Sequence, residues 1–358
     1  MKILYDYQAF IQRIGGVSRY HCELFAKMPS CGATPILPNI FSDNIYLNDI
    51  GIKHRRFMRK WDSSLRLNAY KWINQKLCVQ ALHNDEYDIF HPTFVNPYYI
   101  NHVKGKPIVV TVHDLIHEKT ERFDSDVVRK KRRKQLEQAD AVIAISEETK
   151  SDLLKFYGDI VDETKITIIY HGANQKLADC KTPSMIDGPY LMYIGTRDNY
   201  KNFETLAQTM AHIPENVRLV CTGLPFSDTE EKMLRDLNVR KRIWQKFVTD
   251  EEMHNLLCHA TAFIYPSLME GFGLPILESF RCGCPCIISD IGCFHEVAAD
   301  AAVYFDPVSV EAMAEAINNV VGSPQLQSSL QQKGYERLKI FTWENTVSQT
   351  YEVYKKIL

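Results

Sequence analysis

The sequence predicts an α/β protein built from two doubly wound parallel sheets. Short apolar runs with strand character alternate with helix-length segments along the whole chain, which is the pattern of parallel strands joined by helices. A chain of 358 residues is longer than a single hydrophobic core usually includes, so two domains are expected. A polar stretch over residues 178–188 carries Pro183 and Gly188 without apolar periodicity and is the expected junction.

Ten apolar runs are expected to form the strands, five in each half of the chain. Those of the first half cover residues 2–5, 89–91, 108–112, 141–145 and 166–170. Those of the second half cover residues 190–194, 218–222, 262–265, 286–289 and 302–305. Amphipathic stretches such as 148–156 and 310–321 predict helices that cover the sheets. Ligands of such folds bind at the carboxyl ends of the strands.

The composition is that of a soluble globular protein, with 24% charged and 45% hydrophobic residues. No apolar run approaches the roughly 18 residues of a membrane-spanning helix, and the opening Met-Lys-Ile-Leu-Tyr-Asp lacks the apolar segment of a signal peptide. The ten cysteines match neither a zinc spacing nor a disulfide framework. Free, mostly buried thiols in a reducing cytoplasm are therefore expected.

One segment of the second half combines two carboxylates with a glycine turn. A short apolar strand is followed by Gly271 and Gly273, and Pro275 suits the first turn of a helix. Free backbone N–H groups at that helix start attract an anion, and the glycines let the backbone approach it closely. Glu270 and Glu278 flank this phosphate site, where carboxylates are suited to accept hydrogen bonds from hydroxyl groups. A phosphate beside polyhydroxylated groups describes a sugar nucleotide.

A second glycine turn follows the first strand of the second half. Gly195 is followed by Arg197 and Lys201 and then by a helix-length segment. A small turn of this kind admits a diphosphate, and the cations neutralise it. Both basic residues are therefore candidates for binding a diphosphate.

The segment from Glu270 to Glu278 resembles the Glu-x7-Glu motif of retaining glycosyltransferases with the GT-B fold, most closely glycosyltransferase family 4. Residues that follow at the spacing of that family are Gly283, Pro285, Ser289 and Glu296. The resemblance implies two Rossmann-like domains that face a central cleft. It places an acceptor-side domain over residues 1–180, a nucleotide-sugar domain over residues 181–340, and a last helix, 341–358, that packs back on the first domain.

The resemblance also implies roles for individual residues. Glu278 would bind the ribose hydroxyls, and Glu270 the hydroxyls of the transferred sugar. Lys201 would neutralise the leaving diphosphate, with Arg197 in place of an arginine that the family usually carries where Tyr200 stands. Besides Glu278, the positions expected to contact the donor are Gly15, Gly16, Gly195, Gly223, Gly271, Phe272, Gly273 and Leu274.

Two motifs of the first half resemble the same family. Ile14-Gly-Gly-Val-Ser-Arg-Tyr20 is similar to its Gly-Gly-x-x-Arg-Tyr element near the donor, and a plain tight turn is the alternative. Val112-His113-Asp114-Leu115 is similar to its His-Asp-Leu element, in which the histidine contacts the donor sugar. His113 therefore joins the catalytic candidates, and Asp114 is expected to orient it or to cap a turn.

The resemblance implies a retaining, metal-independent hexosyltransferase. It would move a sugar from a UDP-, GDP- or ADP-sugar to a glycan or a lipid-linked glycan in polysaccharide, lipopolysaccharide or capsule biosynthesis. No cofactor is expected, and no metal-ligand spacing is present in the sequence. A same-face route and a transient covalent intermediate both stay open. A nucleotide-sugar epimerase, a sugar phosphorylase of related fold and a non-catalytic binding module are the alternatives.

Basic residues gather in two runs, residues 54–61 and 129–134. The first interleaves arginine and lysine with Phe57 and Trp61 and is followed by further aromatic residues up to Trp72. This mixture predicts that residues 54–72 attach the protein peripherally to the anionic inner face of the cell membrane. Packing on the sheet or binding of an anionic acceptor is the alternative. The second run is expected to be a solvated helix face. A nucleic-acid partner is disfavoured, because the net charge is −2.

Overall fold

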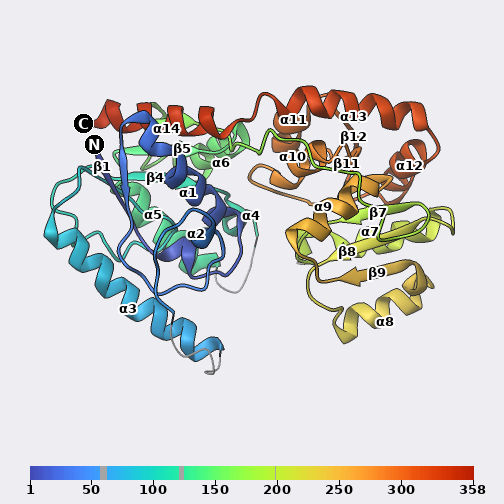
Figure 1. Ribbon diagram of the computed structural model, residues 1–358, viewed down its shortest axis with the longest axis horizontal. Helices are drawn as coiled ribbons and strands as arrows, with labels where there is room; N and C mark the ends of the chain where they lie inside the picture. Colours follow the sequence, from blue (N-terminus) through green and yellow to red (C-terminus); the bar gives the residue numbers. More distant parts are fainter. Residues whose placement is uncertain (57–62, 121–124, 198) are drawn as a thin grey trace. The chain divides into compact units, whose positions relative to one another are not determined.

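The structure is a computed structural model that describes residues 1–56, 63–120, 125–197 and 199–358 (Figure 1). It divides into two compact units, one of residues 1–172 and 343–358 and one of residues 173–342. The expected boundary at residue 180 lies inside the second unit, because the preceding segment is bonded there. Gln175 Nε2 donates to Phe341 O over 2.7 Å, and Ala178 N donates to Arg281 O over 3.0 Å.

The strands of the first unit are all parallel. They form two three-stranded sheets, ordered β2-β1-β3 and β4-β5-β6, which are joined by a bridge between Phe90 and Ile108. Their bounds are Lys2–Tyr5 (β1), Thr34–Ile36 (β2), Ile89–His91 (β3), Val109–Val112 (β4), Ala141–Ala144 (β5) and Ile166–Ile168 (β6). Strand β2 was not expected, because it is short, contains Pro35 and lies at an edge where burial is incomplete.

The first unit also contains α-helices that pack with these strands. They are α1 (Gly16–Lys27), α2 (Tyr46–Asp49), α3 (Ser63–Asn84), α4 (Ile116–Lys119), α5 (Ser125–Glu137), α6 (Glu147–Tyr157) and α14 (Trp343–Ile357). Helix α6 begins where the Ser146 hydroxyl accepts a hydrogen bond from Thr149 N. The C-terminal helix α14 packs against α1, so the end of the chain completes the core of the first unit.

The second unit contains a six-stranded parallel sheet of order β12-β11-β10-β7-β8-β9. Its strands are β7 (Tyr190–Tyr193), β8 (Arg218–Thr222), β9 (Ile243–Lys246), β10 (Ala262–Tyr265), β11 (Cys286–Ser289) and β12 (Ala302–Phe305). The order reverses between β7 and β10, which is the switch point of a doubly wound sheet. Strand β9 was not expected, because Trp244, Gln245 and Lys246 remain partly exposed at the edge.

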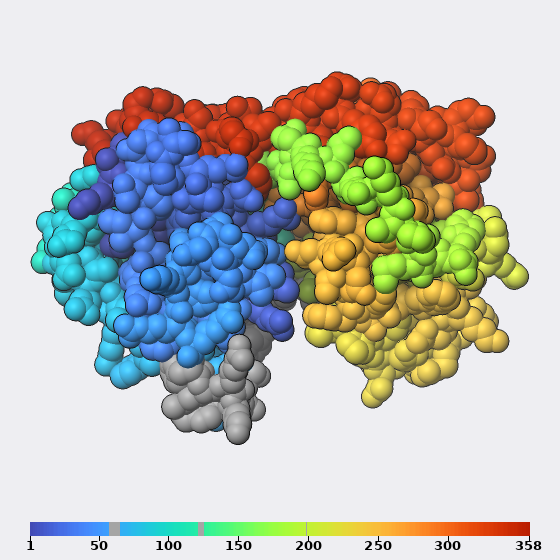
Figure 2. Space-filling model, in the orientation of Figure 1, coloured from blue at the N-terminus to red at the C-terminus, as the bar shows by residue number. Residues whose placement is uncertain are grey.

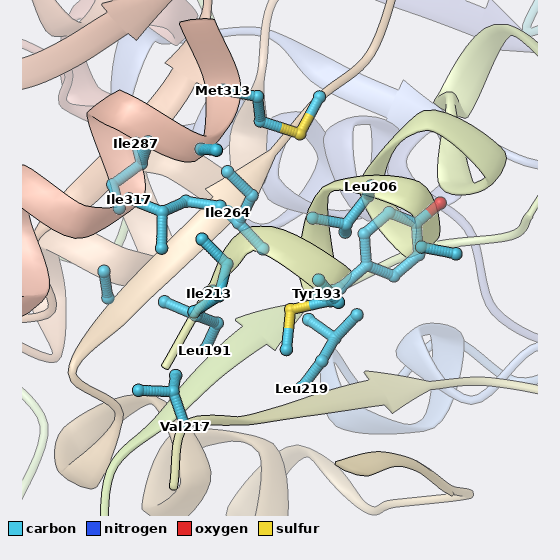
Figure 3. Packing of buried hydrophobic residues seen from close by; sticks show 14 of the residues in the cluster. Leu191, Tyr193, Leu206, Ile213, Val217, Leu219, Ile264, Ile287, Met313 and Ile317 are labelled. Atoms are coloured by element: carbon cyan, nitrogen blue, oxygen red, sulfur yellow. The ribbon is translucent and has the colours of Figure 1, made fainter. Parts of the chain in front are cut away.

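Helices cover the second sheet and bury its apolar residues. They are α7 (Phe203–Thr209), α8 (Asp228–Asp236), α9 (Asp250–His259), α10 (Leu274–Arg281), α11 (Gly292–Ala298), α12 (Val310–Val321) and α13 (Pro324–Leu338). Figure 3 shows how Leu191 and Tyr193 of β7 gather with Leu206 of α7 and with Met313 and Ile317 of α12. This cluster fixes the strands whose carboxyl ends carry the candidate site.

Not all of the cysteines are free thiols, contrary to the prediction from the sequence. Cys180 and Cys258 form a disulfide, with their Cα atoms 5.4 Å apart, so the prediction of free thiols is wrong for this pair. The other eight cysteines are free, and seven of them are buried. Within the described ranges, no helix is long and apolar enough to cross a membrane.

Candidate active site

A buried ion pair lies at the switch point of the second sheet. Lys201 Nζ is 2.6 Å from Glu270 Oε1, and their side chains are only 14% and 10% exposed. Lys201 lies in the turn after β7 and Glu270 in the loop after β10. Because β7 and β10 are neighbours in the sheet, their carboxyl ends bring together two residues 69 positions apart.

Tyr265, the last residue of β10, lies beside this ion pair. Its hydroxyl is 3.4 Å from Lys201 Nζ. Burial, together with the nearby negative charge of Glu270, raises the pKa of Tyr265 well above its usual value. The phenol is therefore neutral at physiological pH and supplies a hydroxyl group beside the lysine. Tyr265 was not predicted as a site residue, because an aromatic residue at a buried strand end is indistinguishable from a core residue.

The glycine turn that follows Glu270 has the backbone geometry expected of it. Gly273 precedes α10 with φ +112°, and a Cβ there would lie 3.0 Å from Ile276 and 3.1 Å from Phe294. Only glycine fits this conformation and this space. Phe272 is buried and meets the ring of Phe341 edge-on, with the ring centroids 5.7 Å apart. Leu274 and Pro275 then start the helix.

Glu278 lies one turn into α10 and is buried, with 8% of its surface exposed. Its Oε2 atom is 3.5 Å from Arg281 Nη1 and 3.3 Å from His254 Nε2. The two carboxylates of the motif therefore have separate environments, since Glu270 pairs with a lysine and Glu278 faces an arginine and a histidine. Neither Arg281 nor His254 was predicted from the sequence.

Arg197 has several bonding partners within the second unit. Its Nε atom is 2.5 Å from Glu230 Oε1, and Nη2 donates to Leu224 O and Pro225 O over 2.9 Å. The guanidinium also lies over the ring of Phe226, 4.8 Å from its centroid. With 8% of its side chain exposed, Arg197 is committed to these partners. The role of Arg197 as the second diphosphate cation stays a prediction.

A cavity of about 1140 Å³ lies at the carboxyl ends of β7 and β8. Gly195 and Gly223, with φ +136° and +110°, line it together with Arg197. Two apolar side chains in its wall are unusually exposed, namely Leu224 at 73% and Phe247 at 70%. Large apolar groups exposed beside a glycine turn fit a flat ring of a ligand. Phe247 was not predicted as a site residue, because a single aromatic residue after a strand does not indicate a binding site.

His113 lies in the first unit directly after β4 and is half-buried. Its ring stacks on that of His171, with centroids 5.5 Å apart, and Tyr20 of the glycine motif meets it edge-on at 5.0 Å. Burial lowers the pKa of His113 to about 4. The imidazole is therefore neutral at physiological pH. Gly15 is the N-cap residue of α1, which begins at Gly16 and carries Tyr20. The contact between Tyr20 and His113 therefore joins the two first-half motifs.

The same core holds further histidines that sequence analysis missed. His91 Nδ1 is 2.6 Å from the Tyr354 hydroxyl, and its Nε2 is 2.9 Å from Thr111 Oγ1. Burial lowers the pKa of His91 to about 3 and lowers that of His21 well below its usual value. His171 is buried as well.

The two basic runs differ in how far the structure describes them. Residues 57–62, including Phe57, Arg59, Lys60 and Trp61 of the expected membrane-binding segment, lie outside the described residues. In the second run, on α5, the arginines are engaged rather than simply solvated. Arg132 pairs with buried Glu118 at 2.9 Å, and Arg133 pairs with Asp159 at 2.7 Å.

Two families of known proteins match this chain. The family described as Glycosyltransferase Family 4 matches residues 14–176, and the family described as Glycosyl transferases group 1 matches residues 180–337. Together the two matches cover most of both units.

Individual proteins of known identity are similar over nearly the whole chain. An O-antigen chain mannosyltransferase B of Escherichia coli is 26% identical, over 99% of this chain and 100% of the relative. Sucrose-phosphate synthase of Thermosynechococcus elongatus has a TM-score of 0.76 at 19% identity, covering 99% of this chain and 98% of that chain. HepE of Anabaena, solved with UDP and glucose, has a TM-score of 0.76 at 18% identity, covering 99% and 100%.

Proposed function

This chain is a glycosyltransferase of the family 4 type with the GT-B fold, and we propose that it transfers a hexose from a nucleoside-diphosphate sugar to a glycan or lipid-linked glycan. The transfer retains the anomeric configuration and needs no metal ion. It serves the assembly of a polysaccharide of the O-antigen or lipopolysaccharide type, as the name of the Escherichia coli relative suggests.

The observation that carries this proposal is the pairing of Lys201 with Glu270 beside the glycine turn before α10. Negative charge builds on the diphosphate as its bond to the sugar breaks. A buried cation at this point stabilises the transition state more than the ground state. In the proposal Lys201 Nζ supplies that charge, while the Glu270 carboxylate accepts hydrogen bonds from the sugar hydroxyls. The short Nζ–Oε1 contact keeps both groups in place before the donor arrives.

The identities of the donor base and the sugar are tested directly with a donor panel. The purified chain is incubated with GDP-mannose, UDP-glucose and ADP-glucose, with and without glycan acceptors, and release of the nucleoside diphosphate is measured. GDP-mannose is the first candidate because of the mannosyltransferase relative, and UDP-glucose the second because of the ligands of HepE. We expect acceptor-dependent release from one donor, unchanged by EDTA. Release that needs no acceptor would instead favour an epimerase or a hydrolase, and loss of activity with EDTA would contradict the metal-free proposal.

We further propose that α3 attaches the protein to anionic membrane surfaces. Leu65 and Trp72 are 62% and 63% exposed and stand seven positions apart, which puts them on one face of the helix. Lys76 Nζ lies 3.6 Å from the centroid of the Trp72 ring. Aromatic and basic side chains on one helix face are typical of interfacial binding.

Vesicle flotation tests this attachment. The wild-type protein should float with anionic vesicles at low salt and be released by added salt. Trp72→Ala should reduce the floated fraction severalfold. Trp244→Ala is the matched control, because Trp244 is also an exposed tryptophan but lies on β9 in the other unit. Equal flotation of the two variants would contradict the role of α3.

A further inference from the structure

Two polar side chains, those of Arg281 and His254, converge on the Glu278 carboxylate. Arg281 Nη1 and His254 Nε2 lie 3.5 and 3.3 Å from the same oxygen, Oε2. Arg281 Nη1 and His254 Nε2 are themselves 3.0 Å apart. Glu278 and Arg281 are close to fully buried, with 10% and 13% of their side chains exposed.

The chemistry of the three groups decides which of them donates. A guanidinium can only donate hydrogen bonds, so Arg281 Nη1 donates to His254 Nε2. That bond makes Nε2 an acceptor and places the imidazole proton on Nδ1. The contact between His254 Nε2 and Glu278 Oε2 then joins two acceptors and is not a hydrogen bond. Within this group of three, Arg281 supplies the positive charge that faces the carboxylate, in an ion pair of 3.5 Å.

Arg281 is in turn fixed by the backbone of a surface segment, residues 173–188, which we call the strap. Arg281 Nε donates to Lys176 O over 2.6 Å, and Ala178 N donates to Arg281 O over 3.0 Å. These two bonds hold both the guanidinium and the main chain of Arg281. Figure 2 shows the strap, in light green, as a strip exposed on the second unit between the orange and red parts of the chain.

The strap is also fastened to α9, the helix that carries His254. The disulfide joins Cys180 of the strap to Cys258 of α9. Asn255 Nδ2 donates to Thr182 Oγ1 over 2.8 Å and to Pro183 O over 3.0 Å. One segment therefore ties together α9 and α10, the helices that supply the histidine and the carboxylate.

We propose that Arg281 is a positioning residue for nucleotide recognition, which orients the Glu278 carboxylate from an anchor on the strap. A carboxylate accepts hydrogen bonds from two neighbouring hydroxyls only in one orientation. It offers about four acceptor sites, so it can be held on one oxygen and still receive hydroxyl groups. The guanidinium also compensates a buried negative charge that would otherwise be costly. This inference rests on the proposed function, in which Glu278 binds the donor ribose.

The test is the preference for ribose over deoxyribose, measured by calorimetric titration. UDP and GDP are compared with 2′-deoxy-UDP and 2′-deoxy-GDP on the full-length wild-type protein. A hydrogen bond to a charged group that is lost with the 2′-hydroxyl corresponds to roughly tenfold weaker binding. We expect Arg281→Ala to shrink this ratio at least threefold. A merely structural defect would weaken both nucleotides equally and leave the ratio intact.

Two further variants keep the test decisive. Lys333→Ala removes another cation of the second unit, from a surface pair with Asp300, and should leave the ratio at the wild-type value. Arg281→Lys keeps the charge but loses the Nε bond to Lys176 O, so an intermediate ratio is expected, and this variant replaces Arg281→Ala if the latter does not fold. An unchanged ratio in the folded Arg281 variant overturns the inference and leaves the proposed function standing. If the wild-type protein binds the ribose and the deoxyribose nucleotides equally, the proposed binding of ribose by Glu278 is wrong, and this inference is wrong with it.

Discussion

Acid should destabilise the first unit, because it holds neutral histidines in buried or half-buried positions. Burial holds the pKa of His91 at about 3 and that of His113 at about 4, whereas an unfolded histidine titrates near 6.5. Below pH 6.5 the unfolded chain therefore binds protons that the folded chain does not. The free energy of unfolding must fall as the pH falls through this range.

The size of the effect follows from the two pKa values. Between pH 7 and pH 5, each of these histidines removes about 2 kcal/mol from the free energy of unfolding. Together they remove about 4 kcal/mol, a large part of the roughly 5–15 kcal/mol that stabilises an ordinary domain. Burial also lowers the pKa values of His21 and His171, which act in the same direction.

Urea unfolding at pH 7, 6 and 5, followed by tryptophan fluorescence, measures this dependence. In His113→Asn one titrating group is gone, so the loss of unfolding free energy from pH 7 to pH 5 should shrink by about 2 kcal/mol relative to the wild type. His212→Asn is the matched control, because His212 is exposed, and it should keep the wild-type dependence. The reasoning is refuted if His113→Asn and the wild type lose the same free energy over this range.

The remaining predictions concern the second unit. Lys201→Ala should lower kcat by about two orders of magnitude, the scale of removing one group that stabilises transition-state charge, and initial rates at saturating donor measure it. Glu278→Ala should weaken binding of the free nucleoside diphosphate, while Glu270→Ala should leave that affinity nearly unchanged and abolish transfer; equal losses of affinity in calorimetry would show that the roles are wrongly divided. Phe247→Ala should weaken nucleoside diphosphate binding by roughly tenfold if the exposed ring stacks on the base. Trp244→Ala, on β9 just before Phe247, should not weaken it, and affinity for inorganic pyrophosphate should stay the same in both variants.

Most strands could be predicted because each is a short apolar run between polar residues. The two exceptions, β2 and β9, are edge strands in which Pro35 or partly exposed polar residues interrupt that pattern. The glycine turn before α10 was also predictable, because its residues are contiguous and each has a local conformational reason. Gly273, at φ +112°, is the plainest case.

Contacts between residues far apart in the sequence could not be predicted. Arg197 follows a glycine turn as a phosphate ligand would, but nothing local reveals that Glu230, 33 positions later, captures its guanidinium. Cys180 and Cys258 are 78 positions apart, so their pairing depends on how the strap crosses α9. The role of Arg281 likewise depends on a backbone carbonyl of residue 176, 105 positions away.

The most direct test of the account is the anomeric configuration of the transferred sugar. The purified wild-type chain is supplied with the donor that the panel identifies and with a glycan acceptor, and the new glycosidic linkage is determined by NMR. The account predicts a linkage with the same anomeric configuration as the donor, formed at least about a hundredfold more slowly by Lys201→Ala. An inverted linkage, or full activity in Lys201→Ala, would contradict it.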